Sequence, residues 1–532
     1  MPEERTHTSI VEPLRNPVFR ALWVAGVISN VGTWMQNAGG AWFMAVLTPS
    51  PTMVALMQTA TSLPIFLVGL PGGALGDVVD RRRLLLFTQA WMLAAAAALA
   101  ALTLAGKATP ALLLGITFAL GLGSALNTPA WQAISPEIVS REDLPAAIAL
   151  SGVSVNIARA VGPALGGFIL AATGAGWVFV LNALSFVAVL VAVWRWRRIA
   201  PASDLPAEDF GGAIRAAWRY VRHSAPLHAV FARSALFVTS AAALWALLPI
   251  VARQDLGLSA FGFGTLQGCL GIGALAGALA LPRLRSRMAI EKIAVAATAL
   301  FSGATLALGI TRGLPLLCVM MTVGGVAWIA IMTSFNVAVL MSAPRWVQAR
   351  AVAVYMLVFQ GGMAGASALW GAVAERLGSS MTLSIAAATL VAGLAIARRI
   401  PLPDSEGVDL SPSVRVPGPD VVVPPEPEDG PVLVLVEYQV ADERVSEFFV
   451  AMHLVRPIRL RDGAIRWELF RDPAKPGRFV EVFVTDSWAE HLRQHQRVTV
   501  ADRAVIDYAR SFHAGDGGPI VSHFVAEPVA QR

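Results

Sequence analysis

The fold is decided by the stretch Gly72-Gly73-Ala74-Leu75-Gly76-Asp77-Val78-Val79-Asp80-Arg81-Arg82-Arg83. It closes an apolar run at about 52 to 76 and places two aspartates and three arginines around its end. As a helix, an apolar run of this length crosses the roughly 30 Å of hydrocarbon in a bilayer. The charges then mark the point where the chain leaves the membrane.

Similar apolar runs recur on both sides of this stretch. The 532 residues are 56% hydrophobic and 14% charged, which is more apolar and less charged than a typical soluble domain. We therefore predict an all-α polytopic membrane protein with 12 transmembrane helices in two six-helix repeats. The expected spans lie at about 19 to 47, 52 to 76, 84 to 105, 110 to 133, 148 to 171, 177 to 196, 228 to 252, 260 to 282, 290 to 310, 315 to 340, 350 to 374 and 379 to 398.

Charge divides the chain into two parts. Residues 1–400 carry 27 Lys/Arg against 14 Asp/Glu, whereas residues 401–532 carry 14 against 21. Most basic residues of the first part fall at the termini and in the even-numbered loops. Because positive loops stay in the cytoplasm, we expect a multi-pass protein of the bacterial inner membrane with both termini cytoplasmic.

The longest loop separates two bundles of six spans. It covers 197–227, between an N-terminal bundle at 1–196 and a C-terminal bundle at 228–400. Phe210, Ile214, Trp218 and Val221 recur in it at helical spacing beside arginines, which predicts an amphipathic helix on the cytoplasmic face. A plain charged linker is the alternative.

The two bundles are related by a constant shift of 204 residues. This shift places Gly73 over Gly277, Gly167 over Gly371 and Gly174 over Gly378. Parallel repeats of this kind occur in transporters, where the substrate site lies between the halves at the middle of the membrane.

The opening stretch also has an internal pattern. A basic stop after a helix explains the arginines, but it does not explain Gly73 four residues before Asp77, followed by Asp80, Arg81 and Arg82. The segment resembles the signature loop between helices two and three of the major facilitator superfamily, a likeness that extends over about Phe19 to Ile400. The resemblance implies that these five residues form a cytoplasmic gate, which opens when the halves rock apart. In the second half Leu281 stands where Asp77 would fall.

Helix five carries a second motif, made of Asn156, Arg159, Gly162, Pro163, Gly166 and Gly167. Glycines and a proline within a span are explained by a kinked, closely packed helix. The run also resembles the glycine-proline motif of drug-exporting facilitators, which implies outward transport.

Arg159 lies deep within that span, where a charge is costly and usually faces a cavity. It either attracts an anionic substrate or bonds structurally to neighbouring helices. We predict a substrate cavity lined by polar residues from several spans: Asn30, Gln36, Gln58, Arg159, Gln267, Asn336 and Gln360. Its apolar walls would be Trp34, Trp42, Trp245 and Trp328. Each of them alone is explained by an interhelical hydrogen bond.

Energy coupling is less visible in the sequence. No Asp or Glu lies in the middle of a span, and no phosphate-binding loop GxxxxGK[ST] is present. Family resemblance implies proton antiport. The expected partners are a small-molecule substrate and the lipid bilayer, and we expect no nucleic acid.

The tail follows a linker at 401–431 that is rich in proline and acid. Its strands are expected at 432–438, 465–470, 479–485 and 520–526, with helices at 443–455 and 488–512. The order βαββαβ predicts an α+β ferredoxin-like cytoplasmic domain at 432–527. Both faces of its first strand are largely apolar, which favours a homodimer.

The tail resembles the dimeric barrels that include antibiotic-biosynthesis monooxygenases. His491 and His495 share a helix face at a spacing compatible with a metal ion. No third ligand is evident, so a solvated or dimer-contact face is favoured, with no metal and no cofactor.

Together, the motifs and the tail resemble the facilitator branch of the enterobactin exporter and the transmembrane secretion effectors. The first hypothesis is therefore a secondary exporter of a small amphipathic metabolite, such as a siderophore, antibiotic or drug, by alternating access. A membrane-tethered, monooxygenase-like enzyme with the helices as anchor is the alternative. Twelve spans exceed what an anchor needs, so we expect no enzyme.

Overall fold

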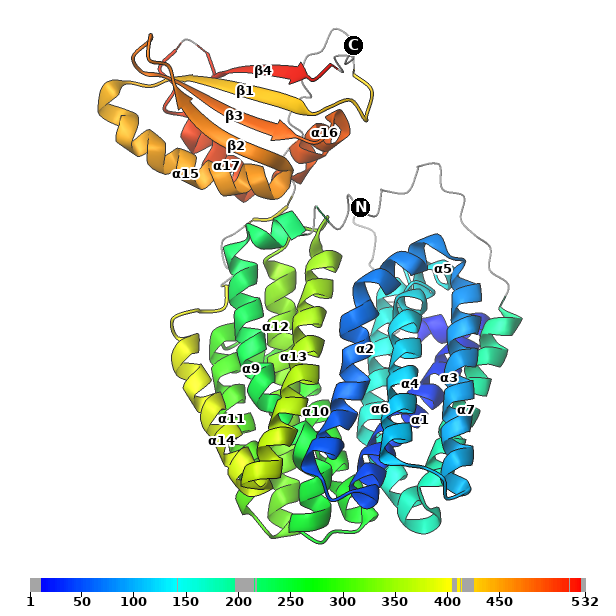
Figure 1. The fold of residues 1–532 in the computed structure, drawn as a ribbon. Helices are drawn as coiled ribbons and strands as arrows, with labels where there is room; N and C mark the ends of the chain where they lie inside the picture. The colour runs from blue at the N-terminus through cyan, green and yellow to red at the C-terminus, as the bar shows by residue number, and fades with distance from the viewer. Residues whose placement is uncertain are drawn as a thin grey trace, which may run out of the picture. The chain divides into compact units, whose positions relative to one another are not determined.

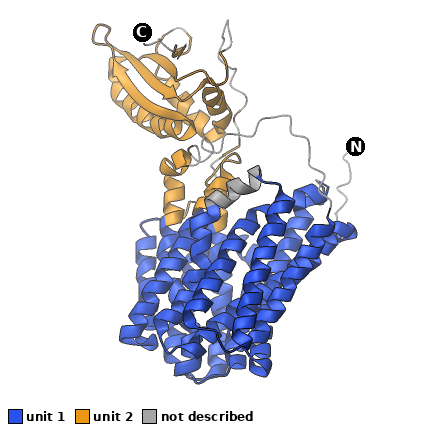
Figure 2. Ribbon diagram, turned by 45° about the vertical axis from the view of Figure 1, so that its right-hand side comes forward, with its two compact units in different colours: residues 1–203, 232–335, 355–401 blue, residues 204–231, 336–354, 402–532 orange. Residues whose placement is uncertain are grey.

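The computed structural model describes residues 11–140, 142–196, 215, 218–403, 409–411, 413, 425–515 and 517–527, with the backbone alone at 70–78. They form two compact units (Figure 2). Unit 1 comprises residues 1–203, 232–335 and 355–401, and unit 2 comprises residues 204–231, 336–354 and 402–532.

The first half of the chain is a bundle of long helices (Figure 1). After the short 3-10 helix Glu12–Arg15 come α1 (Pro17–Leu47), α2 (Pro51–Val78), α3 (Arg81–Leu104), α4 (Pro110–Gln132), the short α5 (Ser135–Ile138), α6 (Leu144–Thr173) and α7 (Ala175–Arg195).

The second half has the same kind of helices. They are α9 (Ala225–Ile250), extended by the π-helical turn Val251–Asp255, then α10 (Ala260–Arg285), α11 (Ile290–Ile310), α12 (Leu314–Met341), α13 (Gln348–Leu377) and α14 (Ser379–Ala397).

Eleven helices in the described part of the chain are long and apolar enough to cross a membrane. The 31-residue α1 is not among them, because Asn30, Gln36 and Asn37 lower its mean hydropathy. The protein is therefore a mostly helical polytopic membrane protein with about 11 candidate spans.

Local sequence signals start several of these helices. The Asn16 side chain accepts hydrogen bonds from the backbone of Val18 and Phe19 at the start of α1. Thr109 and Ser259 cap α4 and α10 in the same way. Such caps satisfy backbone N–H groups that have no partner within the helix, so the helices begin where the sequence supplies a short polar side chain.

The repeat reappears in the backbone. Gly174 lies between α6 and α7 with a φ of 89°, and Gly378 lies between α13 and α14 with a φ of 79°. Both occupy the left-handed region that favours glycine. Two glycines 204 residues apart thus make the same turn in the two halves.

Helix packing defines each half and the contact between them. Within unit 1, α1 packs on α6 and α7, α2 on α4, α3 on α7, and α11 on α14. Across the halves, α10 lies along α6. This last pair forms part of the wall of the candidate site.

Part of the predicted loop helix lies within the described residues. Trp218–Arg222 are helical, with Trp218 exposed and Val221 buried. Phe210 and Ile214 lie outside the described residues.

The tail contains a four-stranded antiparallel sheet in the order β2-β3-β1-β4. Its elements are β1 (Val432–Gln439), the 3-10 turn Asp442–Arg444, α15 (Val445–Asp462), β2 (Ala464–Arg471), β3 (Arg478–Thr485), α16 (Trp488–Arg497), α17 (Val500–Arg510) and β4 (Ile520–Val525). Alternate β1 residues, Val432, Val434 and Val436, are buried in the tail core with Phe448 of α15. The residues between them are partly exposed.

One predicted element of the tail is wrong. The single helix expected at 488–512 is two helices, α16 and α17. Val498 is extended, and Thr499 and Asp502 form a reciprocal capping box that starts α17. The hydrophobic period continues across this break, whereas the cap pattern marks a new helix.

Candidate functional site

A narrow cavity of about 20 Å³, room for about one water molecule, lies among helices of both halves within unit 1. α1 and α6 supply one side, and α9, α10 and α12 supply the other. The lining residues are Trp34, Arg159, Pro163, Trp245, Gln267, Leu270, Gly271, Ala274, Gly325 and Trp328. Aromatic and apolar walls with a few polar groups are typical of small-molecule sites.

Close helix contacts shape this cavity. A Cβ atom on Gly271 of α10 would lie 2.7 Å from the backbone oxygen of Arg159 on α6. Only glycine permits this approach, since backbone atoms cannot move aside as a flexible side chain can. The two halves are therefore in direct backbone contact beside Arg159.

Two buried donors in the cavity lack a partner among the described residues. They are Nε of Arg159 and Nε1 of Trp245. The guanidinium carbon of Arg159 also lies 5.3 Å from the centre of the Trp34 ring, a distance that allows a cation–π interaction. Because an unpaired buried donor is costly, this arrangement suits a bound molecule with hydrogen-bond acceptors or negative charge.

Aromatic rings continue behind the cavity in the second half. Trp245 and Trp328 make an edge contact with ring centroids 5.2 Å apart. Phe237, Phe301 and Phe359 each pack against Trp328 with centroids within 6.0 Å. Such packing holds the two indoles in place and offers a rigid apolar surface to a ligand.

The predicted cavity residues divide into two groups. Arg159 and Gln267 line the cavity, as do Trp34, Trp245 and Trp328. The other five predicted residues do not line the cavity: Asn30, Gln36, Gln58, Asn336 and Gln360. Three of them form hydrogen bonds elsewhere. Asn30 donates to Ser154, Gln36 accepts from Asn182, and Gln58 donates to Ser62. A binding role for any of the seven stays a prediction.

The halves are linked at the end of unit 1 where α1 meets α2. The carboxylate of Glu375 on α13 accepts a hydrogen bond of 2.7 Å from Ser50 Oγ and one of 3.1 Å from the backbone of Thr52. Nearby, Gln254 donates to the backbone oxygen of Pro49 at 3.0 Å. Sequence reasoning missed this link because Glu375 looks like an ordinary residue at a helix end.

The predicted gate motif is partly described. Asp80 caps α3 by accepting from the backbone of Arg83, and Arg81 pairs with Glu137 at 2.7 Å. Arg82 donates to the backbone oxygens of residues 193 and 194 on α7. The surroundings of Gly73 and the side chain of Asp77 lie outside what the structure describes, so the role of the gate stays a prediction.

The helix-five motif lies where α6 packs closely on its neighbours. A Cβ on Gly162 or Gly166 would approach the α1 backbone to about 3 Å, and one on Gly167 would lie 2.8 Å from backbone atoms of α10. Pro163 lines the cavity beside Arg159, whereas Asn156 donates back to the oxygen of Gly152. The motif thus packs α6 against both halves at the site.

A partly buried ion pair in the second half was also missed. Arg233 of α9, whose side chain is 5% exposed, binds both carboxylate oxygens of Glu291 of α11 at 2.7 and 2.8 Å. Arg233 and Glu291 are 58 residues apart, so no local pattern connects them.

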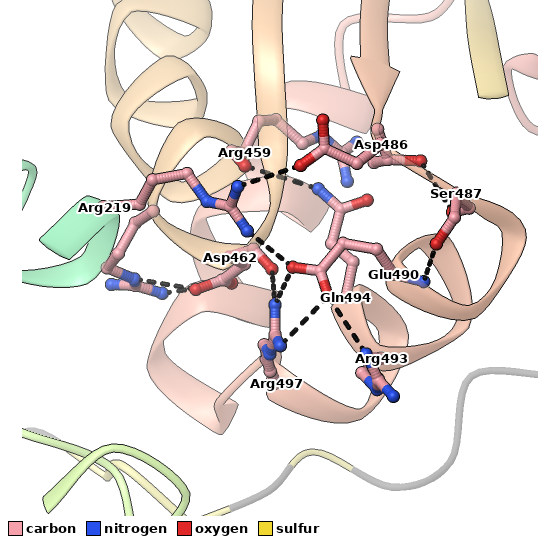
Figure 3. Close-up of polar contacts among 11 residues, drawn as sticks. Arg219, Arg459, Asp462, Asp486, Ser487, Glu490, Arg493, Gln494 and Arg497 are labelled. Carbon is pink, nitrogen blue, oxygen red and sulfur yellow. Dashed lines mark hydrogen bonds and ion pairs between the residues drawn. The ribbon is translucent and has the colours of Figure 1, made fainter. Parts of the chain in front are cut away.

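Unit 2 contains a network of charged residues that joins the loop segment to the tail (Figure 3). Arg219 donates to Glu490 of α16 at 2.7 Å and to Asp486 at 3.3 Å. Arg497 binds the same Glu490 at 2.6 Å. Because Glu490 is buried, it is held between two guanidinium groups rather than by solvent.

The tail also brings three histidines together. His491 and His495 of α16 and His523 of β4 each have a ligand atom within 4.8 Å of the others. The prediction of a solvated or dimer-contact face is wrong for His491, which is buried within the chain. Sequence spacing could not reveal His523, because sheet pairing brings it here from 28 residues beyond His495.

Comparison with known proteins agrees with a transporter. The model of the transmembrane secretion effector family matches residues 8–531. The staphyloferrin A transporter of Staphylococcus aureus is 31% identical over 165 residues, which are 31% of this chain and 42% of that protein. The enterobactin exporter EntS of Salmonella choleraesuis is 29% identical over 241 residues, which are 45% of this chain and 57% of that protein. The chain thus matches about half the length of these curated relatives.

Solved structures support the same fold. A mutant of the nucleoside transporter NupG superposes with a TM-score of 0.62 at 12% identity and covers 72% of this chain and 99% of that chain. A bacterial homologue of the lysosomal transporter Spinster, inward-facing and occupied, superposes with a TM-score of 0.59 at 15% identity and covers 73% and 98%. At this identity the likeness concerns the fold alone.

Proposed function

Because the chain belongs to the transmembrane secretion effector family of major facilitator transporters, we propose that it exports a siderophore-like metabolite by alternating access. The observation that carries the proposal is the cavity between the halves, in which Arg159 and Trp245 present two donors without a partner among the described residues. A site shared by two halves is exposed to either side of the membrane in turn when they rock.

The chemistry of the cavity suits a particular substrate class. A guanidinium group favours carboxylates and other anions, and the indole rings favour flat apolar or aromatic groups. Two relatives are named for the transport of enterobactin and of staphyloferrin A. We therefore propose an amphipathic metabolite with acidic or acceptor-rich groups as cargo, for which siderophores come first and antibiotics or drugs second.

Transport by the full chain in proteoliposomes tests this function. Loaded, iron-free enterobactin and staphyloferrin A are offered separately, and we expect a protein-dependent, saturable efflux of at least one of them. A neutral nucleoside in the same vesicles is the control for leakage. If the efflux rates of siderophores, antibiotics and dyes all equal the rates from protein-free vesicles, export is refuted as the function.

We also propose that protons drive the export in exchange for the substrate. A proton carrier in a membrane needs an acid whose surroundings change between the two states. Glu291 is the first acid to test, because it is held against the buried Arg233. A pH-sensitive dye in the vesicle lumen detects the exchanged proton, and an unchanged lumen during efflux would exclude antiport.

The finer topology is likewise a proposal. With α1 counted as a span, twelve helices cross the bacterial inner membrane and both termini are cytoplasmic, as the loop charges favour. The gate at Gly73, Asp77, Asp80, Arg81 and Arg82 then faces the cytoplasm. Reporter fusions after Asp404 and Gly174 distinguish the two sides, and an active periplasmic reporter at Asp404 would contradict it.

We propose that the tail is a ferredoxin-like domain resembling the dimeric monooxygenase barrels and that it dimerises through its open sheet face. The strand order supports the fold. Exposed Phe470, Ile520 and Phe524 lie on edge strands of that sheet, and burial of such residues favours a partner. We would measure the mass of the purified full chain and subtract the bound detergent. The resulting protein mass distinguishes a dimer from a monomer.

Glu375→Gln is expected to weaken the closure of the halves where α1 meets α2. The change removes the negative charge that accepts from Ser50 and Thr52, so the ratio of closed to open molecules should fall by about three- to tenfold, as for one exposed hydrogen bond. Pulsed EPR distances between labels at Leu47 and Leu377 measure the closure. Arg376→Gln, at the neighbouring exposed position, should leave the distances unchanged; an equal effect of both would refute the link.

A further inference from the structure

We propose that His491, His495 and His523 form a binding site for a divalent late transition-metal ion, with Zn²⁺ as the best fit. The site lies in the tail, where α16 faces the edge strand β4. It is separate from the transport cavity in both sequence and chemistry.

Geometry is the first support. Nε2 of His491 and Nε2 of His495 are 3.2 Å apart, and the rings of His491 and His523 have centroids 4.9 Å apart. Imidazole nitrogens bound to Zn²⁺ at about 2.0–2.1 Å in a tetrahedral site lie about 3.3 Å from each other. The first pair is already at that spacing. The third nitrogen lies within 4.8 Å of the others, so it has to move closer by at most about 1.5 Å.

The positions of the ligands on their elements favour a stable site. His491 and His495 are four residues apart on one helix, so their side chains lie one turn apart on the same face. His523 pairs with Val434 in the sheet register, and Val434 faces the tail core. Helix and sheet therefore hold the three rings rather than a loop, which is how precise metal sites are built.

The alternative to a metal site is a structural cluster in which the histidines only pack together and form hydrogen bonds. It explains the 3.2 Å contact between Nε2 of His491 and Nε2 of His495 as one hydrogen bond, but it does not require the His523 ring to lie beside them. A bound ion would use one lone pair from each of the three rings. The nearby positive charge of Arg459 is offset, since its guanidinium binds the buried Glu481 at 2.9 Å.

The ligand set indicates which ions fit. Three imidazoles without a thiolate or carboxylate suit Zn²⁺, Co²⁺, Ni²⁺ or Cu²⁺ and disfavour Ca²⁺ and Mg²⁺, which prefer oxygen ligands. A fourth position is left for water or for a group of a bound molecule. The ion also ties α16 to β4, and α16 carries Glu490, which holds Arg219.

Titration of the purified, chelator-stripped full chain tests the site. We expect one Zn²⁺ per chain by calorimetry, and one Co²⁺ with the intense visible absorption of a tetrahedral site. His495→Gln and His523→Gln should each weaken Zn²⁺ binding by at least about tenfold, because even changes in the outer shell of a metal site cost about 10- to 100-fold. His453→Gln, at an exposed position of α15, is the matched control and should bind normally.

The outcomes separate a site from adventitious binding. Equal losses in His453→Gln and the two ligand variants would overturn the proposal, as would fewer than one Co²⁺ for every two chains. If a ligand variant fails to fold, the wild-type Co²⁺ spectrum decides, because weak octahedral absorption also overturns the site. Siderophore efflux by metal-free protein is measured in parallel, so failure of the metal site does not bear on the transport function.

Discussion

Arg159→Gln is expected to lower efflux of an anionic substrate by about tenfold or more. The change removes the positive charge from the cavity but keeps a polar side chain of intermediate length. A hydrogen bond to a charged group contributes about 1.5–3 kcal/mol, which corresponds to roughly 10- to 150-fold in binding. The buried, unpartnered Nε shows that no described residue uses this donor, so a substrate acceptor would lose its strongest contact.

Initial efflux rates measured over a range of substrate concentrations check this expectation. Arg159→Lys, which keeps the charge but loses the planar fork, should retain part of the activity. Arg283→Gln, at an exposed position near the end of α10, is the control for a lost surface arginine. If anionic and neutral substrates lose equally and the membrane yield falls, Arg159 is a structural residue and not a binding one.

The second large effect is expected from Gly167→Ala. The added Cβ would lie 2.8 Å from the backbone oxygen of Ala260 and 2.8 Å from the Cα of Gly264, and real Cβ atoms do not come so close to backbone. α6 and α10 must then separate, so the arrangement in which the halves touch here should no longer form. Since export needs every state of the cycle, we expect transport to fall to near background.

A matched control lies on the same helix. Outside the neighbouring backbone of its own helix, Gly152 has no atom within 4 Å of the position that a methyl group would take, so Gly152→Ala should be neutral for transport. Alanine even stabilises a helix by about 1 kcal/mol relative to glycine. Gly264→Ala should reproduce the defect from the α10 side, because its Cβ would meet the backbone of residues 163 and 167. Normal efflux by a well-inserted Gly167→Ala protein would show that the contact is dispensable.

Local pattern accounts for much of what could be predicted. A span needs only an apolar run of sufficient length, and β1 needs only an alternation of buried valines, so both are visible in neighbouring residues. Pairs of glycines such as Gly174 and Gly378 reveal the repeat, because left-handed turns demand the same residue in both halves. The break at Thr499 has a cap pattern in the sequence, but the hydrophobic period that runs across it favours one continuous helix.

Contacts between distant residues account for the rest. Gln36 and Gln267 look alike in sequence, yet Gln36 bonds to Asn182 in the first half and Gln267 faces the cavity. Trp245 looks like an apolar wall, and only packing shows that its N–H is buried without a partner among the described residues. The direction of a polar side chain depends on its neighbours in space, which the residue type does not encode.

The membrane-spanning class, the four strands of the tail and the matching glycines at Gly174 and Gly378 could therefore be predicted from the sequence. Each of these follows from spacing along the chain. Only tertiary packing shows that buried donors of Arg159 and Trp245 lack a partner among the described residues, that Glu375 bonds to the other half, and that His523 lies beside His491 and His495. The physical reason is that hydrophobic periodicity sets which residues are buried, whereas helix packing and strand register set which buried residues meet.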